Sequence, residues 1–195
     1  MNAYGVVEEF ERRVAEFAGA PYAVAVESGT AALFLPCKYL DVGTVTIPAR
    51  TYISVPMAII HAGGHVKFED YPWQGVYQLK PYPIWDGAKR FRRGMYQGGF
   101  HMLSFHIKKH LDIGRGGMIL TDDAQAVTWF KKARYDGRSG KPYNEERVDM
   151  LGWNLYMTPD QAARGLMLMD LVAPDLPDQL EDYPDLRQMP VFQCA

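Results

Sequence analysis

Residues 104–117 read SFHIKKHLDIGRGG. Within this segment, Lys109 follows the extended pattern Ser-Phe-His and precedes a glycine pair that leads into the apolar run MILTD. Lysine normally lies on solvated faces, so a lysine between a strand end and a glycine-rich turn is unusual. An amine at such a place is typical of proteins that form an imine with a carbonyl compound or with pyridoxal phosphate (PLP). The alternative is that Lys108 and Lys109 are solvated loop residues.

Three other segments favour the chemical interpretation of Lys109. They are SGTAAL at 28–33, WDGAK at 85–89 and GWNLYMTPDQAARGL at 152–166. PLP chemistry needs a lysine, an acid facing the pyridine nitrogen, an aromatic ring over the cofactor and donors for the phosphate. The segments follow one another in the order that a PLP enzyme would need.

The turn at 27–29 is a candidate phosphate site. Residues 22–26 predict a strand, the Glu-Ser-Gly that follows predicts a turn, and the residues from 30 onward predict a helix. This order places free backbone N–H groups at a helix N-terminus, where phosphate binds well. Gly29 and Thr30 are therefore candidate backbone donors, and the hydroxyl groups of Thr30 and Ser104 are candidate side-chain donors.

Asp86 and Tyr52 are candidates for the ring of the cofactor. Asp86 ends the short apolar segment Ile84-Trp85 and could keep the pyridine nitrogen protonated. The alternative for Asp86 is a strand-end carboxylate that caps a turn. Tyr52 follows the predicted strand VTIP and could stack on the ring, or it could pack in the core as helix-start tyrosines often do.

Two histidine pairs raise the alternative of a metal site. His106 and His110 are four residues apart, as are His61 and His65, and such a spacing on a helix can bind a metal. The glycine pair inside 61–65 and the strand-like start of 104–110 are incompatible with that helical geometry. We therefore expect no metal site.

Composition indicates an ordinary soluble globular protein. The chain has 195 residues, which suits one main domain, with 48% hydrophobic and 23% charged residues. The net charge of −2 gives no general attraction to nucleic acid or to an anionic membrane. The basic run of Lys89, Arg90, Arg92 and Arg93 is the local exception, and it is either a solvated edge or a site for a diphosphate.

The cysteines and the N-terminus suggest a reducing, cytoplasmic setting. Cys37 and Cys194 are far apart and have neither disulfide-framework nor zinc spacing. No apolar stretch approaches the length of a membrane span, and acidic residues at 8, 9 and 11 stand where a signal peptide would be basic and then apolar.

The hydrophobic pattern predicts an α/β fold. Strands are expected at 22–26, 45–48, 65–68, 84–86, 100–105 and 118–121, and helices near 7–17, 30–35, 52–62, 123–135 and 159–172. Segments 71–83 and 138–149 are expected to be loops. Alternating strands and helices predict a sheet covered by helices on both faces, which is a three-layer architecture. We expect a core domain at 1–173 and a C-terminal tail or arm at 174–195.

Together these motifs, with TIPARTY at 46–52, resemble the DegT/DnrJ/StrS family of sugar aminotransferases. The resemblance runs from about residue 7 to about residue 172, and the SFHxxK and GxNxxMTxxQAA elements are its most specific parts. It implies the large domain of the fold-type I PLP-dependent transferases, in shortened form.

The resemblance also implies roles for individual residues. Lys109 matches the lysine that forms the imine with PLP, and Asp86 matches the aspartate at the pyridine nitrogen. Tyr52 falls where the family places its stacking aromatic ring. The other matches are phosphate contacts at Gly29, Thr30 and Ser104, and Asn154, which matches an asparagine that reaches the phosphate from the other subunit of a homodimer.

Some positions depart from the family pattern. Arg115 replaces the acid of a GEGG motif, and Lys89 stands where the family usually has glutamine or histidine. The smaller C-terminal domain of the family is essentially absent, so one subunit alone is expected to have little that covers the cofactor.

The resemblance implies a PLP-dependent aminotransferase that acts on a keto-sugar, expected to be nucleotide-linked, with an amino acid such as glutamate as the amino donor. The alternatives are a PLP-dependent sugar dehydratase and a catalytically silent dimeric binding or assembly protein.

Overall fold

The computed structural model describes residues 4–193 as an α/β fold. The helices are α1 (Gly5–Ala18), α2 (Gly29–Tyr39), α3 (Ser54–His61), α4 (Ala124–Ala133) and α5 (Pro159–Met169). The strands are β1 (Tyr22–Val26), β2 (Thr44–Pro48), β3 (His65–Glu69), β4 (Tyr77–Gln78), β5 (Ile84–Asp86), β6 (Phe100–Ser104) and β7 (Gly117–Thr121). The predicted helices and strands are therefore present, with small differences at their ends.

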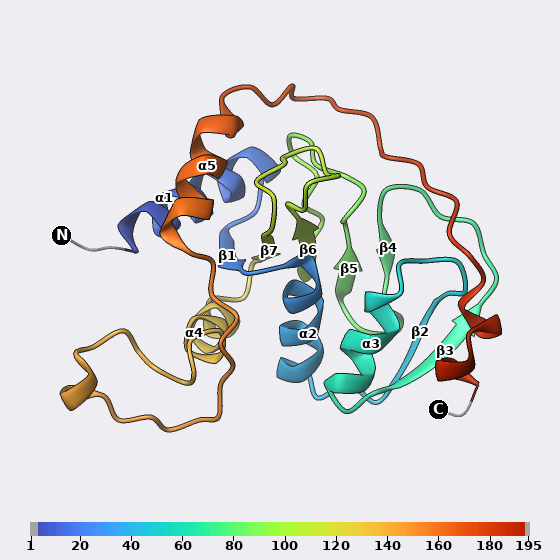
Figure 1. Cartoon of the computed structure of the whole chain (residues 1–195), viewed down its shortest axis with the longest axis horizontal. Coiled ribbons are helices and arrows are strands. Elements are labelled where there is room, and N and C mark those ends of the chain that lie inside the picture. Colours follow the sequence, from blue (N-terminus) through green and yellow to red (C-terminus); the bar gives the residue numbers. More distant parts are fainter. Residues whose placement is uncertain (1–3, 194–195) are drawn as a thin grey trace.

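The strands form two sheets that lie beside each other (Figure 1). The larger sheet has the order β1-β7-β6-β5-β4, and the smaller one pairs β2 with β3 in parallel. In the larger sheet β5 and β6 are parallel, whereas β1 with β7, β7 with β6 and β4 with β5 are antiparallel. Because β5 and β6 run in the same direction, their carboxyl ends at Asp86 and Ser104 lie at one edge of the sheet.

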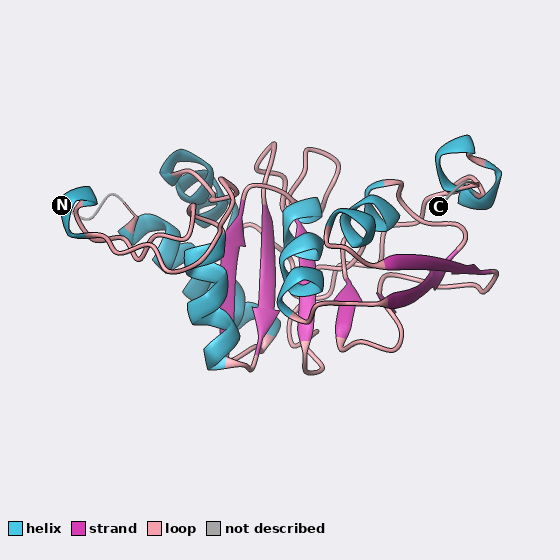
Figure 2. Ribbon diagram, turned by 90° about the horizontal axis from the view of Figure 1, so that it is seen from below, coloured by secondary structure: helices cyan, strands magenta, loops and turns pink. Residues whose placement is uncertain are grey.

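Both faces of the larger sheet are buried. Val24 and Val26 pack into a cluster with α2, α3 and α4, while Ala23 and Ala25 face the opposite cluster with α1 and α5. Successive side chains of a strand point to opposite faces, so this division gives three layers. Strand β7, in the interior of the sheet, is buried at every residue. Figure 2 shows the strands of this sheet side by side, with the β2-β3 pair at one end. The predicted three-layer α/β class is confirmed.

Local sequence signals explain where two helices begin. The Ser28 side chain accepts a hydrogen bond from the backbone N–H of Ala31, which caps the start of α2. Thr158 and Gln161 form a capping box at the start of α5, and Pro159 occupies its first turn. The predicted start of the last helix at Thr158-Pro159 is therefore confirmed.

The prediction that 71–83 is entirely a loop is wrong. Tyr77 and Gln78 form strand β4, which pairs with Asp86 and Trp85 of β5. A strand of two residues is too short to show a period-two pattern, and the tyrosines and prolines around it are typical of loops.

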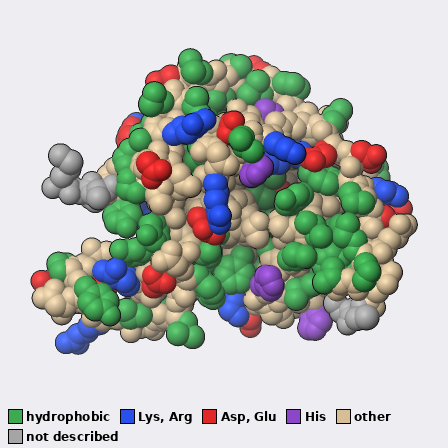
Figure 3. Space-filling model, viewed as in Figure 1, with side chains coloured by type: hydrophobic (Ala, Val, Ile, Leu, Met, Phe, Trp, Pro, Cys, Tyr) green, Lys and Arg blue, Asp and Glu red, His purple; other side chains and the backbone are tan. Residues whose placement is uncertain are grey.

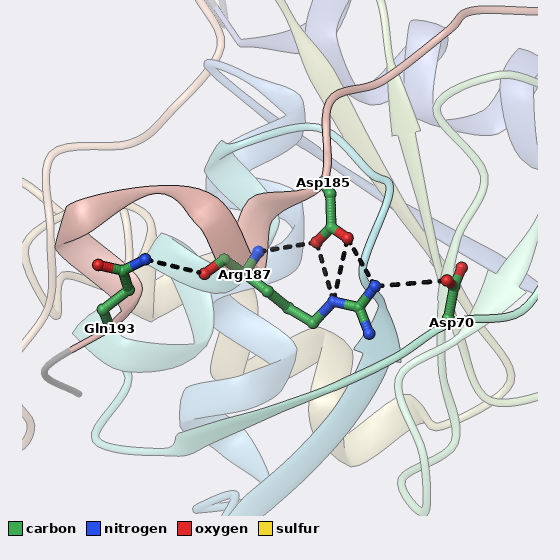
Figure 4. Close-up of polar contacts among 4 residues, drawn as sticks. All are labelled: Asp70, Asp185, Arg187 and Gln193. Atoms are coloured by element: carbon green, nitrogen blue, oxygen red, sulfur yellow. Dashed lines mark hydrogen bonds and ion pairs between the residues drawn. The ribbon is translucent and has the colours of Figure 1, made fainter.

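The C-terminal segment crosses the molecule from α5 to the smaller sheet (Figure 1). Between α5 and residue 193 it contains two short turns of 3₁₀ helix, at Leu186–Gln188 and Pro190–Phe192. Arg187 lies between Asp185 and Asp70, which ties the segment to the end of β3 (Figure 4). Cys194 lies outside the described residues. Among residues 4–193, no helix is both long enough and apolar enough to cross a membrane.

Candidate functional site

A cavity of about 220 Å³ lies at the sheet edge where β5 and β6 end. Its walls come from these strand ends, the start of α2, the loop before α3, the β6–β7 loop and the C-terminal tail. The cavity brings together seven of the residues predicted from the sequence: Gly29, Thr30, Tyr52, Asp86, Lys89, Ser104 and Lys109. These residues are spread over 81 positions of the chain, from 29 to 109, and the fold places them around one space.

Asp86 is a buried carboxylate held by two donors. Its side chain accepts hydrogen bonds from the Tyr77 hydroxyl at 2.9 Å and from the Ala88 backbone N–H at 2.9 Å. Thr51 contacts the same tyrosine hydroxyl at 2.7 Å. Burial raises the pKa of Asp86, and the two hydrogen bonds oppose this rise. Asp86 therefore does more than cap a turn, because its buried carboxylate lines the cavity and is held by two hydrogen bonds.

Lys109 lies in the turn after β6. Its backbone N–H donates to the His106 carbonyl at 2.8 Å, and the loop around it is closed by Phe105 N–H donating to Gly116 O at 2.9 Å. Burial and the neighbouring Lys89 lower the pKa of Lys109 to about 8. A lysine with this pKa has a useful fraction of neutral, nucleophilic amine near neutral pH. Lys108 also lines the cavity but is exposed, whereas Lys109 is half-buried, so the two neighbouring lysines have different surroundings.

The start of α2 forms a cradle for an anion. The first backbone N–H groups of an α-helix have no partner within the helix, and Ser28 satisfies that of Ala31 but not those of Gly29 and Thr30. A Cβ at Gly29 would lie 2.9 Å from the Ser104 Cβ, so only glycine lets the helix start approach Ser104 this closely. The predicted phosphate contacts are therefore adjacent in space.

Tyr52 borders the cavity with 56% of its surface exposed, and its ring centroid lies 6.3 Å from that of Tyr183. Stacking of Tyr52 on a cofactor remains a prediction. Arg115, which departs from the family pattern, also lines the cavity and forms an ion pair with Glu27 at 2.9 Å.

The C-terminal tail supplies two side chains that sequence reasoning missed. Glu181 and Tyr183 both line the cavity, and Glu181 forms an ion pair with Lys89. The Tyr183 ring is stacked on Trp73, with centroids 6.2 Å apart and an interplanar angle of 14°. The tail thus covers part of the site that we expected a single subunit to leave open. No motif in the sequence marks these residues.

The basic run after Asp86 does not form a free anion site. Lys89 is buried beside Glu181, and Arg90 binds Asp178 through two hydrogen bonds of 2.7 and 2.6 Å. Neither Arg92 nor Arg93 lines the cavity. On the face seen in Figure 3, basic and acidic side chains are interspersed. The arginines therefore give no local support for binding of a diphosphate.

Asn154 is the predicted residue that the structure leaves outside the cavity. It is exposed, and its side-chain amide donates to Asp136 at 3.4 Å. A contribution of Asn154 from another subunit stays a prediction. Within the described part of the chain, no three His, Cys, Asp or Glu side chains come together in a group that could hold a metal ion.

The sequence matches a known protein family over most of its length. The model of the DegT/DnrJ/EryC1/StrS aminotransferase family matches residues 1–81 and 91–175. This protein belongs to the DegT/DnrJ/EryC1/StrS aminotransferase family. The resemblance predicted from the motifs is thereby confirmed.

Two curated proteins are related to this chain over most of its length. The spore coat polysaccharide biosynthesis protein SpsC of Bacillus subtilis is 26% identical over 216 residues, which cover 82% of this chain and 55% of SpsC. The GDP-perosamine synthase of Caulobacter vibrioides is 24% identical over 212 residues, which cover 85% of this chain and 57% of the synthase. The chain therefore spans about half the length of these relatives.

A solved structure shows the same fold. The PLP form of Spr1654 from Streptococcus pneumoniae superposes with a TM-score of 0.73 and 20% sequence identity, covering 86% of this chain and 59% of that one. The type I transferase fold predicted from the motifs is confirmed, for a chain that covers only part of the solved one.

The family match omits two segments that line the cavity. Residues 82–90 carry Asp86 and Lys89, and the residues beyond 175 carry Glu181 and Tyr183. In this DegT/DnrJ/EryC1/StrS member, the position of these four side chains at the cavity is therefore known from the structure and not from the family match.

Proposed function

We propose that this chain binds PLP through Lys109 and transfers an amino group from an amino acid, such as glutamate, to a nucleotide-linked keto-sugar. The observation that carries the proposal is a half-buried lysine, with a pKa of about 8, in one cavity with a buried carboxylate and a helix N-terminus. These are the amine, the acid and the anion seat that PLP chemistry needs.

When bound, PLP supplies an electron sink for the carbon that gains or loses the amino group. Lys109 would hold the cofactor covalently and, once displaced by a substrate amine, would take a proton at Nζ from the substrate carbon and return one. Asp86 would keep a proton on the ring nitrogen by charge attraction. Gly29, Thr30 and Ser104 would bind the phosphate, and the tail would exclude water.

A second, more open cavity supports a hydroxyl-rich substrate. It measures about 700 Å³, adjoins the first cavity, and shares Trp73, Lys89, Glu181 and Tyr183 with it. Two buried polar atoms on its wall, Tyr71 Oη and Gln179 Oε1, have no hydrogen-bond partner among the described residues. Aromatic faces beside unsatisfied polar groups suit a sugar ring. The nucleotide link is supported by the GDP-perosamine synthase among the relatives.

The proposal is tested by adding PLP to the purified protein. We expect a visible absorption band, loss of that band on borohydride reduction, and a phosphopyridoxyl group on the peptide that contains Lys109. Lys109→Ala should abolish the band, whereas the matched variant Lys108→Ala should retain it, because only Lys109 is half-buried beside Asp86. Label on Lys108, or no band, would contradict the cofactor assignment.

Turnover is tested separately. Glutamate should bleach the band, and a nucleotide-diphosphate keto-sugar should restore it with release of the amino sugar, several orders of magnitude faster in the wild type than in Lys109→Ala. A protein that binds PLP but whose band resists all amino donors would be the silent binding protein.

A further inference from the structure

Two lysines of the candidate site share one cavity. The side chains of Lys89 and Lys109 both line it, and the positive charge of Lys89 lowers the pKa of Lys109. Only a neutral amine attacks a carbonyl, and two adjacent ammonium groups repel, so one of them loses its proton readily. Which lysine becomes neutral then decides which lysine reacts.

The side chain of Lys89 is buried and has two direct partners. Its side chain is only 8% exposed, and its ammonium group forms an ion pair with the Glu181 carboxylate. The Tyr183 ring centroid lies 5.5 Å from Lys89 Nζ, which adds a cation–π contact. The ammonium group of Lys89 is therefore occupied by an anion and an aromatic face, and both hold it in place.

Lys109 lacks such a direct partner among the described residues. The charged groups that act on it are Lys89, Asp86 and Glu181. Asp86 accepts its hydrogen bonds from Tyr77 and Ala88, and Glu181 is paired with Lys89, so both act on Lys109 only through longer-range attraction. Burial and the charge of Lys89 oppose them and lower the pKa of Lys109. The two amines are therefore unequal because Glu181 binds one of them.

The tail holds Glu181 firmly at this position. Three residues earlier, Asp178 binds Arg90 in a largely buried ion pair, with side chains 6% and 18% exposed. Between these pairs the Gln179 backbone N–H donates to the Lys89 carbonyl at 2.9 Å. The segment 178–181 thus runs alongside Lys89 and Arg90 with three fixed contacts, which fixes the direction from which Glu181 approaches.

We propose that Glu181 is a positioning residue: by pairing with Lys89 it occupies that amine and leaves Lys109 as the amine that reacts. The inference rests on the proposed function only in taking Lys109 as the reactive lysine. It assigns a role in the site to a tail that lies outside the segments matched by the family.

The test measures how aldehyde label divides between the two lysines. Wild type, Glu181→Gln and the matched control Asp182→Asn are treated with PLP and borohydride and, separately, with formaldehyde and cyanoborohydride, and the modified peptides are quantified. We expect label on Lys109 in the wild type and in Asp182→Asn. In Glu181→Gln the ratio of Lys89 label to Lys109 label should rise about tenfold or more, because Lys89 loses the carboxylate that occupies its amine.

A rescue variant distinguishes loss of the charge of Glu181 from a structural disturbance, and the two labelling reactions distinguish failure of this inference from failure of the proposed function. Glu181→Asp retains the charge and should bring the ratio back toward the wild-type value, whereas a purely structural disturbance would not be rescued in this way. An unchanged ratio in Glu181→Gln, with label still on Lys109, would overturn the inference and leave the proposed function standing. If PLP labels neither lysine in the wild type, the proposed function fails, while the formaldehyde ratio still decides the role of Glu181.

Discussion

At the residue scale, burial moves the two main groups of the site toward their neutral forms. It lowers the pKa of Lys109 and raises the pKa of Asp86, because a charged group loses hydration in either case. For the lysine this yields a nucleophile. For the aspartate it yields a carboxyl group whose charged form gains from any cation bound beside it, as the hydrogen bonds from Tyr77 and Ala88 already show in part.

We expect the reactivity of Lys109 to titrate with a midpoint near pH 8. With a pKa of about 8, about 10% of the amine is neutral at pH 7, against about 0.03% for an ordinary lysine. The measurement is the rate of reductive methylation at Lys109 as a function of pH, quantified by peptide mapping. Lys89→Gln should raise the midpoint, because it removes the neighbouring positive charge, and Lys108→Gln is the control that should not. A midpoint above pH 10 in the wild type would show that burial and Lys89 do not lower the pKa of Lys109.

The lowered pKa of Lys109 also makes the free energy of unfolding depend on pH. Because the folded pKa of Lys109 lies below its unfolded value of 10.5, the unfolded chain binds more protons between about pH 8 and 10.5. The contribution of Lys109 to the free energy of unfolding therefore rises with pH across this window, and it is least favourable below pH 8.

The sequence identified residues that stand in recognisable motifs and missed those that reach the site through folding. Lys109, Asp86 and Gly29 lie in short patterns whose chemistry can be stated without a structure. Tyr77 becomes a partner of Asp86 only because β4 pairs with β5, and Glu181 meets Lys89 only because the tail folds back over ninety residues of chain. Such contacts carry no local sequence signal.

At the scale of elements, the site depends on three pieces that meet at one sheet edge. The parallel pair β5 and β6 presents Asp86 and Ser104 at adjacent ends, and the capped start of α2 approaches Ser104 closely because residue 29 is glycine. Hydrophobic periodicity predicted these strands and this helix. It could not predict the path of the tail, which is held by ion pairs and by single backbone hydrogen bonds.

We expect the tail to be released when its buried ion pair is broken. Asp178→Asn leaves Arg90 without its anionic partner, and detachment of the tail lets water reach both groups at little cost to the core. Limited proteolysis within 174–188 should become about tenfold faster or more, with a small change in the melting temperature. Asp182→Asn, which alters an exposed acid of the same segment, is the control.

Release of the tail should become easier at low pH, where Asp178 gains a proton. Hydrogen bonding to Arg90 lowers the pKa of Asp178 below its ordinary value of 3.8, so the pair stabilises the docked tail above that pH and weakens as pH falls through the lowered pKa. Equal proteolysis of Asp178→Asn and the wild type at pH 7 would show that other contacts hold the tail.

At the scale of the whole molecule, one loop exposes large apolar side chains that the rest of the described chain does not cover. The loop between α4 and α5 extends from the body (Figure 1), and Tyr143, Val148 and Leu151 on it are 81%, 55% and 90% exposed. Large apolar side chains exposed together mark surfaces that another protein covers. Asn154 follows directly and is exposed as well. We therefore place this loop in the interface of the homodimer that the family resemblance implies, and the homodimer itself stays a prediction.

We expect a dimer whose sites are completed in trans by Asn154, and mixed subunits distinguish this from a site built within one chain. Lys109→Ala subunits lack the reactive amine, and Asn154→Ala subunits lack the proposed phosphate contact. In a hybrid dimer, the site with Lys109 intact receives Asn154 from the Lys109→Ala partner, so one site per dimer is whole. Mixing the two inactive variants after mild dissociation should restore up to about a quarter of the wild-type PLP band and activity, since about half the dimers are hybrids with one whole site each.

Leu151→Asp should lower the dimer fraction in sedimentation while leaving the monomer folded, because a charge in the apolar loop disfavours the interface. A stable monomer that binds PLP tightly, or a mixture that restores nothing while each variant is dimeric, would place Asn154 outside the site.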